Sequence, residues 1–326
     1  MVGNNGNEMI AGSNLEKMLR AGHFAVTGEL GPPTGCKKEV IAEKAEHLKG
    51  VVDAVNITDN QTAVARMSSI SVAAMLVDMG LEPVVQMTVR DRNRLAIQAD
   101  LFGAWALGAR NLLCLTGDHM TFGNHPEAKG VYDMDSIQFL GMMRDMGEKG
   151  VGQSGDELEG APTFFLGAAA NPFAPPYEYR PYRLAKKVQA GAKFIQTQCI
   201  YNIPRFKEYM QRAGDLGLLD DVYVMAGVTP LKSTGMAWYM ANNVPGLDVP
   251  EDVVDRMRAA ISDIPKEEKK ARAKAQREKG IEICAETIQQ MQEIPGVCGV
   301  HIMAIEWESA VPVIAEKAGL LPRPTL

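Results

Sequence analysis

Two carboxylates at the ends of short apolar runs are the strongest candidates for chemistry in this chain. Glu29 follows AVTG and precedes LGPP, and Asp118 stands in the segment LTGD. A carboxyl set among apolar residues and prolines favours its protonated form, because desolvation penalises the anion. Glu29 therefore suits a general acid, although a capping or salt-bridged glutamate would look the same. Asp118 follows a glycine that lets the backbone approach a ligand closely, or it is the Asx-turn residue that opens a long loop.

Polar side chains end other apolar runs. Gln196 and Gln198 lie two residues apart in FIQTQ, so a strand would place both on one face. Gln86 and Thr58 close two earlier runs, and Glu306 closes the last one. An amide offers a donor and an acceptor side by side, which suits the edge of a pterin or purine ring. These residues together indicate a polar, planar substrate.

Metal chemistry is not expected. His119 and His125 share the segment 117–134 with one adjacent carboxylate, and neither HxH nor HExxH occurs. The five cysteines are widely spaced without a CxxC pair, which indicates unpaired thiols in a reducing compartment and no iron–sulfur cluster held by this chain alone. No GxSxG motif is present, and a cysteine–histidine nucleophile stays open.

The elements that must position these residues alternate along the chain. Glycines end helical stretches, and short runs rich in Val, Ile and Leu follow. Strands are predicted near 24–29, 52–57, 83–88, 111–116, 163–169, 193–198, 222–228 and 299–304. Eight βα units of about 40 residues predict a single (β/α)8 barrel over 1–326, with its chemistry at the carboxyl ends of the strands. An open doubly wound sheet usually carries a glycine-rich phosphate loop, and neither GxGxxG nor GxxxxGK[ST] occurs.

Two segments depart from this pattern. Residues 250–293 hold more helix than one crossover needs, which predicts an extra helical segment before the last strand. Within it, Lys266 to Lys279 carries seven basic and three acidic residues, as a solvated face or a docking surface for an acidic partner would. Residues 1–14 are expected to be loosely ordered.

Composition restricts the class of protein. The 326 residues are 46% hydrophobic and 23% charged, which is ordinary for a globular protein. The net charge of −6 disfavours a nucleic-acid partner. No apolar run reaches the ~20 residues that cross a bilayer, and MVGNNGNEMIAGSN lacks the features of a signal peptide. A cytoplasmic protein without a membrane partner is expected.

From about Phe24 to its C-terminus the chain resembles the methylenetetrahydrofolate reductases, which are flavin-dependent (β/α)8 barrels. The resemblance rests on the order of five short motifs at successive strand ends: GELGPP with Glu29, VNITDNQ with Asn56 to Gln61, LTGDH with Asp118, KKVQAGAKFIQTQ with Gln198, and MAGVTP with Gly227 and Pro230. The segments NITDNQTAVARMSS and FGNHPEAK look like the branch found in anaerobes that make or oxidise methyl groups.

The resemblance implies a role for each matching residue. Glu29 matches the general acid that protonates N10 of the folate, and Asp118 matches an aspartate that tunes the flavin and takes part in catalysis. Gln198 matches the glutamine that holds the pterin, with Gln196 beside it. Flavin contacts are implied at Thr58, Gln86, Thr116, Gly117, Asp118, His119, Lys186 and Lys187.

Three departures from the family pattern bear on cofactor and reductant. Thr116 replaces a common arginine, ELGPP replaces EFFPP, and HIMAIEWES lacks an aromatic-Asn ending. FAD is expected, with FMN as the alternative, and the reductant is either NAD(P)H or a reducing partner protein. A homo- or hetero-oligomer is expected. Two other functions stay open: a pterin methyltransferase barrel that hands a methyl group to a corrinoid, and a non-catalytic barrel subunit.

Overall fold

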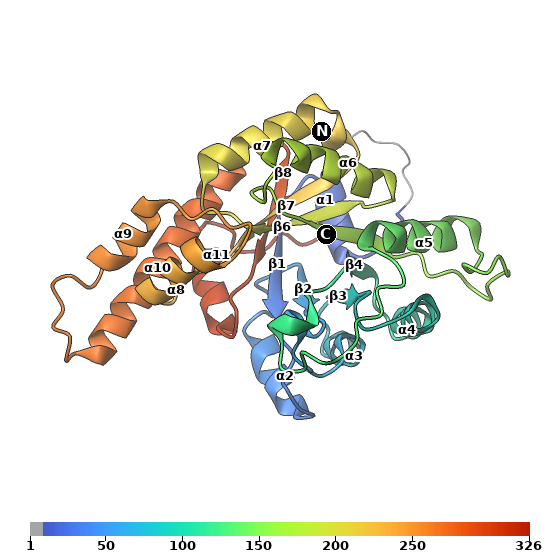
Figure 1. Cartoon of the computed structure of the whole chain (residues 1–326), viewed down its shortest axis with the longest axis horizontal. Helices are drawn as coiled ribbons and strands as arrows, with labels where there is room; N and C mark the ends of the chain where they lie inside the picture. Colours follow the sequence, from blue (N-terminus) through green and yellow to red (C-terminus); the bar gives the residue numbers. More distant parts are fainter. Residues whose placement is uncertain (1–8) are drawn as a thin grey trace.

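Eight parallel strands form a closed barrel at the centre of the computed structural model, which describes residues 9–326 (Figure 1). Each strand pairs with the next in sequence, and β8 pairs with β1, so the predicted (β/α)8 barrel is confirmed. The strands are β1 Ala25–Leu30, β2 Ala54–Ile57, β3 Pro83–Thr88, β4 Asn111–Leu115, β5 Phe165–Ala170, β6 Phe194–Cys199, β7 Tyr223–Val228 and β8 Val297–Ile302.

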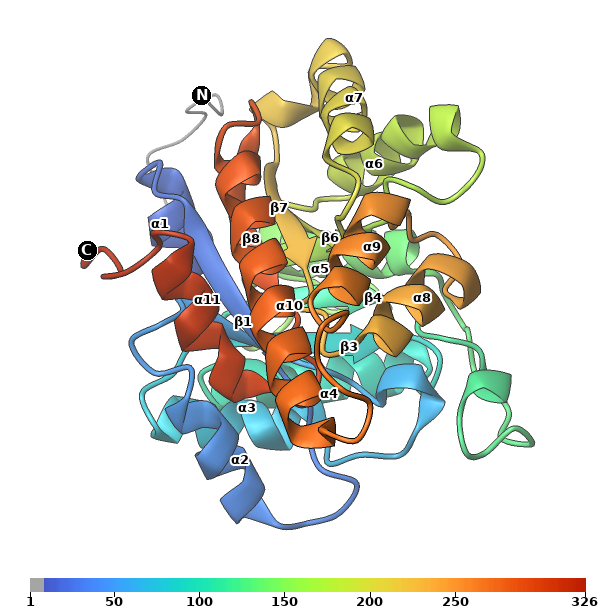
Figure 2. The ribbon, with the colours of Figure 1, turned by 90° about the vertical axis from the view of Figure 1, so that its left-hand side faces the viewer.

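Helices surround the barrel, as Figures 1 and 2 show from two directions. They are α1 Asn14–Arg20, α2 Lys38–Glu46, α3 Ser69–Asp78, α4 Arg94–Ala106, α5 Ser136–Lys149, α6 Arg180–Gln189, α7 Ile203–Asp215, α8 Thr234–Asn243, α9 Glu251–Ala259, α10 Lys269–Gln292 and α11 Val311–Lys317. The extra helical segment before β8 is confirmed as α9 and α10. Among the described residues, no helix is both long enough and apolar enough to span a bilayer.

Burial on both faces explains why the strand sequences are almost wholly apolar. Outward side chains such as Val26 and Ile195 pack against the helices, and inside the barrel the rings of Phe165 and Phe194 stack with centroids 5.2 Å apart. At the amino-terminal ends of the strands, Leu15 of α1 joins this inner cluster. The interior of the barrel is therefore filled at that end by apolar side chains.

The start of the described chain is held by Glu16. Its carboxylate accepts hydrogen bonds from the backbone N–H groups of Ile10, Ala11 and Gly12 at 2.7, 2.9 and 3.0 Å. Residues 1–8 of the segment expected to be loosely ordered lie outside the described residues.

The long helix α10 packs closely against the chain that follows β7. A Cβ placed on Gly280 would lie 1.8 Å from the carbonyl oxygen of Leu231, so no side chain fits there without a backbone shift. We expect Gly280→Ala to lower the free energy of unfolding by about 1–3 kcal/mol through overpacking. Urea denaturation measures this change.

Gly141 of α5 provides the matched control, because a Cβ placed on it would have nothing within 4 Å. Gly141→Ala should leave stability unchanged or raise it by about 0.5–1 kcal/mol, since alanine favours the helix. Equal effects at the two positions would refute the close α10 contact.

Candidate active site

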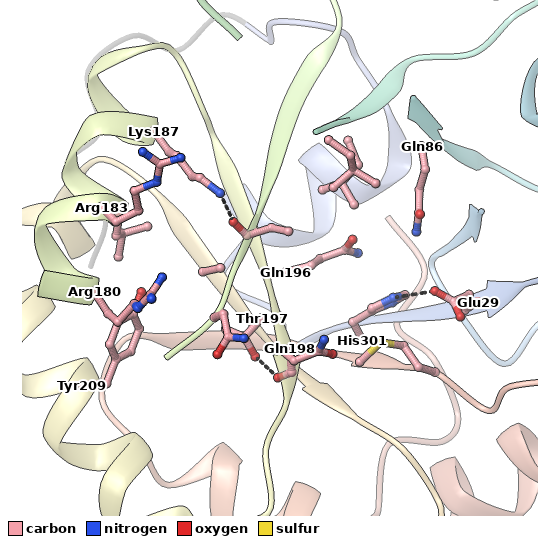
Figure 3. Close-up of a pocket in the computed structure, with 17 residues that line it drawn as sticks. Glu29, Gln86, Arg180, Arg183, Lys187, Gln196, Thr197, Gln198, Tyr209 and His301 are labelled. Atoms are coloured by element: carbon pink, nitrogen blue, oxygen red, sulfur yellow. Dashed lines mark hydrogen bonds and ion pairs between the residues drawn. The ribbon is translucent and has the colours of Figure 1, made fainter. Parts of the chain in front are cut away.

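A cavity of about 340 Å³ opens at the carboxyl ends of the strands (Figure 3). Its polar lining comes from separate elements: Glu29 from β1, Gln86 from β3, Gln196 and Gln198 from β6, and His301 from β8. A larger hollow of about 1260 Å³ lies at the amino-terminal ends. Chemistry in this fold takes place at the carboxyl ends, so the smaller cavity is the candidate site.

Glu29 belongs to a chain of buried polar side chains that crosses the barrel. Its Oε2 lies 3.7 Å from His301 Nε2, and His301 Nδ1 lies 2.9 Å from Thr27 Oγ1. Thr27 Oγ1 accepts a hydrogen bond from Gln196 Nε2 at 3.1 Å. Gln196 also forms two hydrogen bonds with the Asn56 amide, at 2.6 and 3.0 Å. All five residues are at most 8% exposed.

These hydrogen bonds favour one tautomer of His301. The Thr27 hydroxyl already accepts from Gln196, so its own proton is free to be donated to His301 Nδ1. The other ring nitrogen, Nε2, then carries the histidine proton and directs it toward Glu29. This arrangement gives the Thr27 and Gln196 donors hydrogen-bond acceptors, as buried polar groups require, and leaves the His301 Nε2–H facing Glu29 at a distance longer than a hydrogen bond.

Helix α6 forms the cationic side of the cavity. Figure 3 shows Arg180, Arg183 and Lys187 across the cavity from Glu29. Burial, assisted by repulsion from Arg183, lowers the pKa of Lys187 to about 8. The Lys187 ammonium donates to the carbonyl oxygen of Ala169, and Arg180 donates to the carbonyls that follow β5. A cationic wall of this kind suits an anionic group on a ligand.

The structure brings five of the predicted site residues together and places the others around them. Glu29, Gln86, Gln196, Gln198 and Lys187 line the cavity. The remaining predicted contacts are not among its lining residues. These residues are Thr58, Thr116, Gly117, Asp118, His119 and Lys186.

Most of this second group follows β4. Thr116, Asp118 and His119 are exposed or half-buried, and Lys186 lies on α6 outside the cavity. Thr58 is only 2% exposed, yet its hydroxyl has no hydrogen-bond partner among residues 9–326. This unsatisfied hydroxyl after β2 fits an additional polar group at the mouth of the barrel.

Sequence reasoning missed His301 and misplaced the polar end of β8. Glu306 was expected to close that strand, but β8 ends at Ile302 and the Glu306 side chain is 58% exposed beside Lys44 and Arg66. His301 takes its place in the cavity. The pairing of Thr27 with His301 across the β1–β8 junction is the signal that would have found it.

The donor set of the cavity fits an organic ligand. Among the described residues no group of three or more His, Cys, Asp or Glu side chains is placed to hold a metal ion. The cavity instead offers one carboxyl, three glutamine amides, a histidine and a cationic wall. A ring system with amide-like edges and an anionic arm has matching groups for all of these.

An eight-stranded barrel with a buried carboxyl and paired amides at its carboxyl ends defines a small-molecule site of the (β/α)8 enzyme type. The family model for methylenetetrahydrofolate reductase matches residues 14–319, so the chain belongs to that family and the resemblance is confirmed.

Curated relatives agree with this family. The chain is 24% identical over 258 residues to a probable methylenetetrahydrofolate reductase (NADPH) of Caenorhabditis elegans, a match that covers 78% of this chain and 35% of that protein. It is 26% identical over 253 residues to methylenetetrahydrofolate reductase 2 of Schizosaccharomyces pombe, covering 73% and 36%. The chain thus spans about a third of the length of these relatives.

A solved structure shares the fold. An uncharacterized protein from Clostridium thermocellum, described as binding two copies of 5-methyl-5,6,7,8-tetrahydrofolic acid, superposes with a TM-score of 0.59 at 13% identity. The match covers 94% of this chain and 100% of that one. At this identity the likeness supports the fold alone.

The buried hydrogen bonds of Thr27 predict that the stability of the protein depends on its hydroxyl. Thr27→Val keeps the shape of the side chain but leaves His301 Nδ1 and one Gln196 donor without their partner. We expect a loss of about 1–3 kcal/mol in the free energy of unfolding, measured by urea denaturation.

Thr27→Ser is the control for this change. It retains the hydroxyl and loses one methyl group, which costs about 0.8 kcal/mol. A valine variant as stable as the serine variant would show that the hydrogen bonds of Thr27 do not contribute to stability as described.

Proposed function

We propose that this chain reduces 5,10-methylenetetrahydrofolate to 5-methyltetrahydrofolate with a bound flavin. The observation that carries the proposal is the buried Glu29 carboxyl beside His301, facing the cavity with Gln196 and Gln198. Family membership supports it. The Clostridium thermocellum neighbour, which is described as binding a methylated tetrahydrofolate, agrees with a folate ligand for this fold.

Glu29 is the general acid in this proposal. Protonation of N10 opens the five-membered ring of the substrate and leaves an electrophilic iminium carbon. Glu29 lines the cavity, so its carboxyl is placed to deliver a proton to a bound substrate. When that proton has left, the His301 Nε2–H directed at Oε2 can stabilise the resulting carboxylate.

The two glutamines have different tasks. The Gln196 amide forms hydrogen bonds with Thr27 and Asn56, so it holds Thr27 in place next to His301. Gln198 Oε1 accepts from the Cys199 N–H at 3.1 Å, which leaves its NH₂ group without a partner among the described residues. We therefore assign the pterin edge to Gln198, with Gln196 beside it in the lining of the substrate site.

A bound flavin supplies the hydride chemistry that reduces the iminium carbon, from its N5 position. The residues that would hold it are the unsatisfied Thr58, Gln86 and the cationic Lys187 of the cavity wall. Further flavin contacts are proposed at Thr116, Gly117, Asp118, His119 and Lys186. FAD is the proposed form and FMN the alternative.

The reductant, either NAD(P)H or a reducing partner protein, stays a prediction. The homo- or hetero-oligomeric state stays a prediction as well. The basic run in α10 is partly engaged, because Arg272 donates to the carbonyl of Ile261 and Lys279 pairs with Glu282 at 2.6 Å. Lys269 and Lys270 are exposed and stay available to a partner. The methyltransferase alternative differs in one simple respect, since it predicts a purified protein without flavin absorbance.

Glu29→Gln tests the assignment of the general acid. The amide is nearly isosteric, so fold and flavin content should be retained. The rate at which methylenetetrahydrofolate oxidises the reduced enzyme should fall by roughly 10²–10⁴-fold, the usual contribution of a general acid. Anaerobic stopped-flow absorbance follows this half-reaction, while reduction of the flavin by a chemical donor should be unaffected.

Glu306→Gln is the matched control, since this exposed glutamate lies beyond β8. It should turn over like the unmodified enzyme. Normal folate reduction by Glu29→Gln would remove Glu29 from the mechanism.

Lys187 predicts a pH dependence of flavin binding. Because its pKa is about 8, the ammonium loses its charge as the pH rises through that value. Attraction for a flavin phosphate is therefore present below pH 8 and lost above it, which gives at most about a tenfold decrease in affinity between roughly pH 7 and pH 9. Fluorescence titration of flavin-depleted protein measures the affinity.

Two arginine variants complete this test. Lys187→Arg keeps its charge and should abolish the decrease, whereas Lys186→Arg, one residue away on α6 and outside the cavity lining, should retain it. A decrease that persists in Lys187→Arg would assign the pH dependence to another group.

A further inference from the structure

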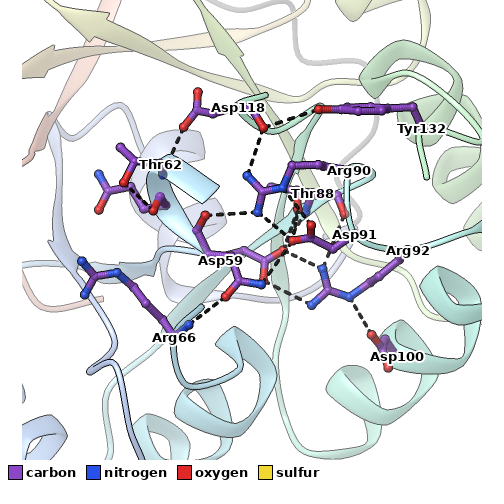
Figure 4. A network of polar contacts seen from close by, with 12 residues as sticks. Asp59, Thr62, Arg66, Thr88, Arg90, Asp91, Arg92, Asp100, Asp118 and Tyr132 are labelled. Atoms are coloured by element: carbon purple, nitrogen blue, oxygen red, sulfur yellow. Dashed lines mark hydrogen bonds and ion pairs between the residues drawn. The ribbon is translucent and has the colours of Figure 1, made fainter. Parts of the chain in front are cut away.

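Three loops at the mouth of the barrel meet at one buried guanidinium, that of Arg90 (Figure 4). They follow β2 at 58–68, β3 at 89–93 and β4 at 117–134. Arg90 is 1% exposed and is among the largest fully buried side chains of the described chain. An arginine buried to this degree needs a partner for its charge and for its donors.

The partners of Arg90 come from all three loops. Its Nε and Nη2 donate to the Asp91 carboxylate at 2.8 and 2.7 Å, within the β3 loop. Nη2 also donates to the carbonyl of Asn60 at 3.1 Å, and Nη1 donates to the carbonyl of Asp118 at 3.2 Å. The Arg90 carbonyl accepts from the N–H of Val131 at 2.7 Å. Arg90 thus fixes both the start and the end of the β4 loop.

The β2 loop in turn holds the Asp118 side chain. The backbone N–H of Thr62 donates to Asp118 Oδ2 at 3.2 Å. Asn60, Thr62 and Ala63 have φ of 44°, 55° and 56°, a left-handed conformation that is strained for these residues. Such a turn persists only when its surroundings determine it, and the bond from Arg90 to the Asn60 carbonyl is one such restraint.

The two loops also touch without space for a side chain. A Cβ placed on Gly123 would lie 1.9 Å from the carbonyl oxygen of Ala63. Gly123 therefore allows the β4 loop to lie directly on the strained turn. A substitution here would push the loops apart while leaving Arg90 and Asp118 unchanged.

We infer that Arg90 is the positioning residue that fixes the Asp118 carboxylate at the flavin, acting through the Asp118 backbone and the Asn60–Ala63 turn. This inference rests on the proposed function, in which Asp118 contacts the flavin, and on the role of tuning the flavin that the family resemblance implies for Asp118. Asp118 is not buried, so without these restraints its carboxylate would move freely in water. A charge acts on a nearby redox centre according to its distance and its solvation, so a mobile carboxylate has a weaker effect.

The midpoint potential of the flavin bound to the intact protein is the readout. Asp118→Asn removes a negative charge that disfavours the reduced anion, so it should raise the potential and serves as the reference shift. Arg90→Lys keeps the positive charge but not the fork of donors, so it should raise the potential by part of that shift. Gly123→Ala, with Arg90 intact, should also raise it.

Two controls separate positioning from a general loss of structure. Gly103→Ala in α4 has nothing within 4 Å of the new Cβ and should leave the potential unchanged. The double variant Arg90→Lys, Asp118→Asn should match Asp118→Asn alone, because Arg90 acts through that carboxylate and its charge is kept. If Arg90→Lys does not fold, Gly123→Ala carries the same comparison.

Unchanged potentials in the folded Arg90 and Gly123 variants, with a shift in Asp118→Asn, would overturn the inference. So would additive shifts in the double variant, or no shift in Asp118→Asn itself. Methylenetetrahydrofolate turnover by the unmodified protein decides the proposed function separately, since none of these potentials depends on it.

Discussion

The need to pair every polar group inside the barrel is the constraint on which the site depends. Glu29, His301, Thr27, Gln196 and Asn56 come from four strands and are buried where water cannot compensate an unmade hydrogen bond. Their contacts require Thr27 to lie opposite His301, which is the register that closes β1 onto β8. The register that closes the barrel therefore also places His301 beside Glu29.

This arrangement divides the cavity into two halves. The acid and the amides extend from the strands, while the cations extend from α6 across the space. A ligand that spans the cavity meets the Glu29 carboxyl at one end and positive charge at the other. The loops joined by Arg90 lie outside these two halves and set the environment of Asp118 at the mouth. In the proposed function, proton delivery and tuning of the flavin are thus assigned to different parts of the fold.

Much of this could be predicted from the sequence, because strands buried on both faces have short apolar runs that end in polar residues. One cavity is lined by five residues that this logic and the family resemblance selected, Glu29, Gln86, Gln196, Gln198 and Lys187, and their roles stay predictions. His301 was missed because its partner Thr27 is 274 residues away, and only barrel closure joins them. Arg90 was missed for the same reason, since it acts by donating to the backbone carbonyl groups of Asn60 and Asp118, which only the folded loops bring close to it.

The tautomer of His301 is the most direct test of the proposed hydrogen-bond network that joins Glu29, His301, Thr27 and Gln196. In protein labelled with ¹⁵N-histidine, long-range ¹H–¹⁵N correlation spectra distinguish the two ring nitrogens, and the His301 signals are assigned by their absence in His301→Gln. The account predicts a proton on Nε2, directed at Glu29, and an unprotonated Nδ1 that accepts from Thr27. A proton on Nδ1, alone or together with Nε2, would contradict it.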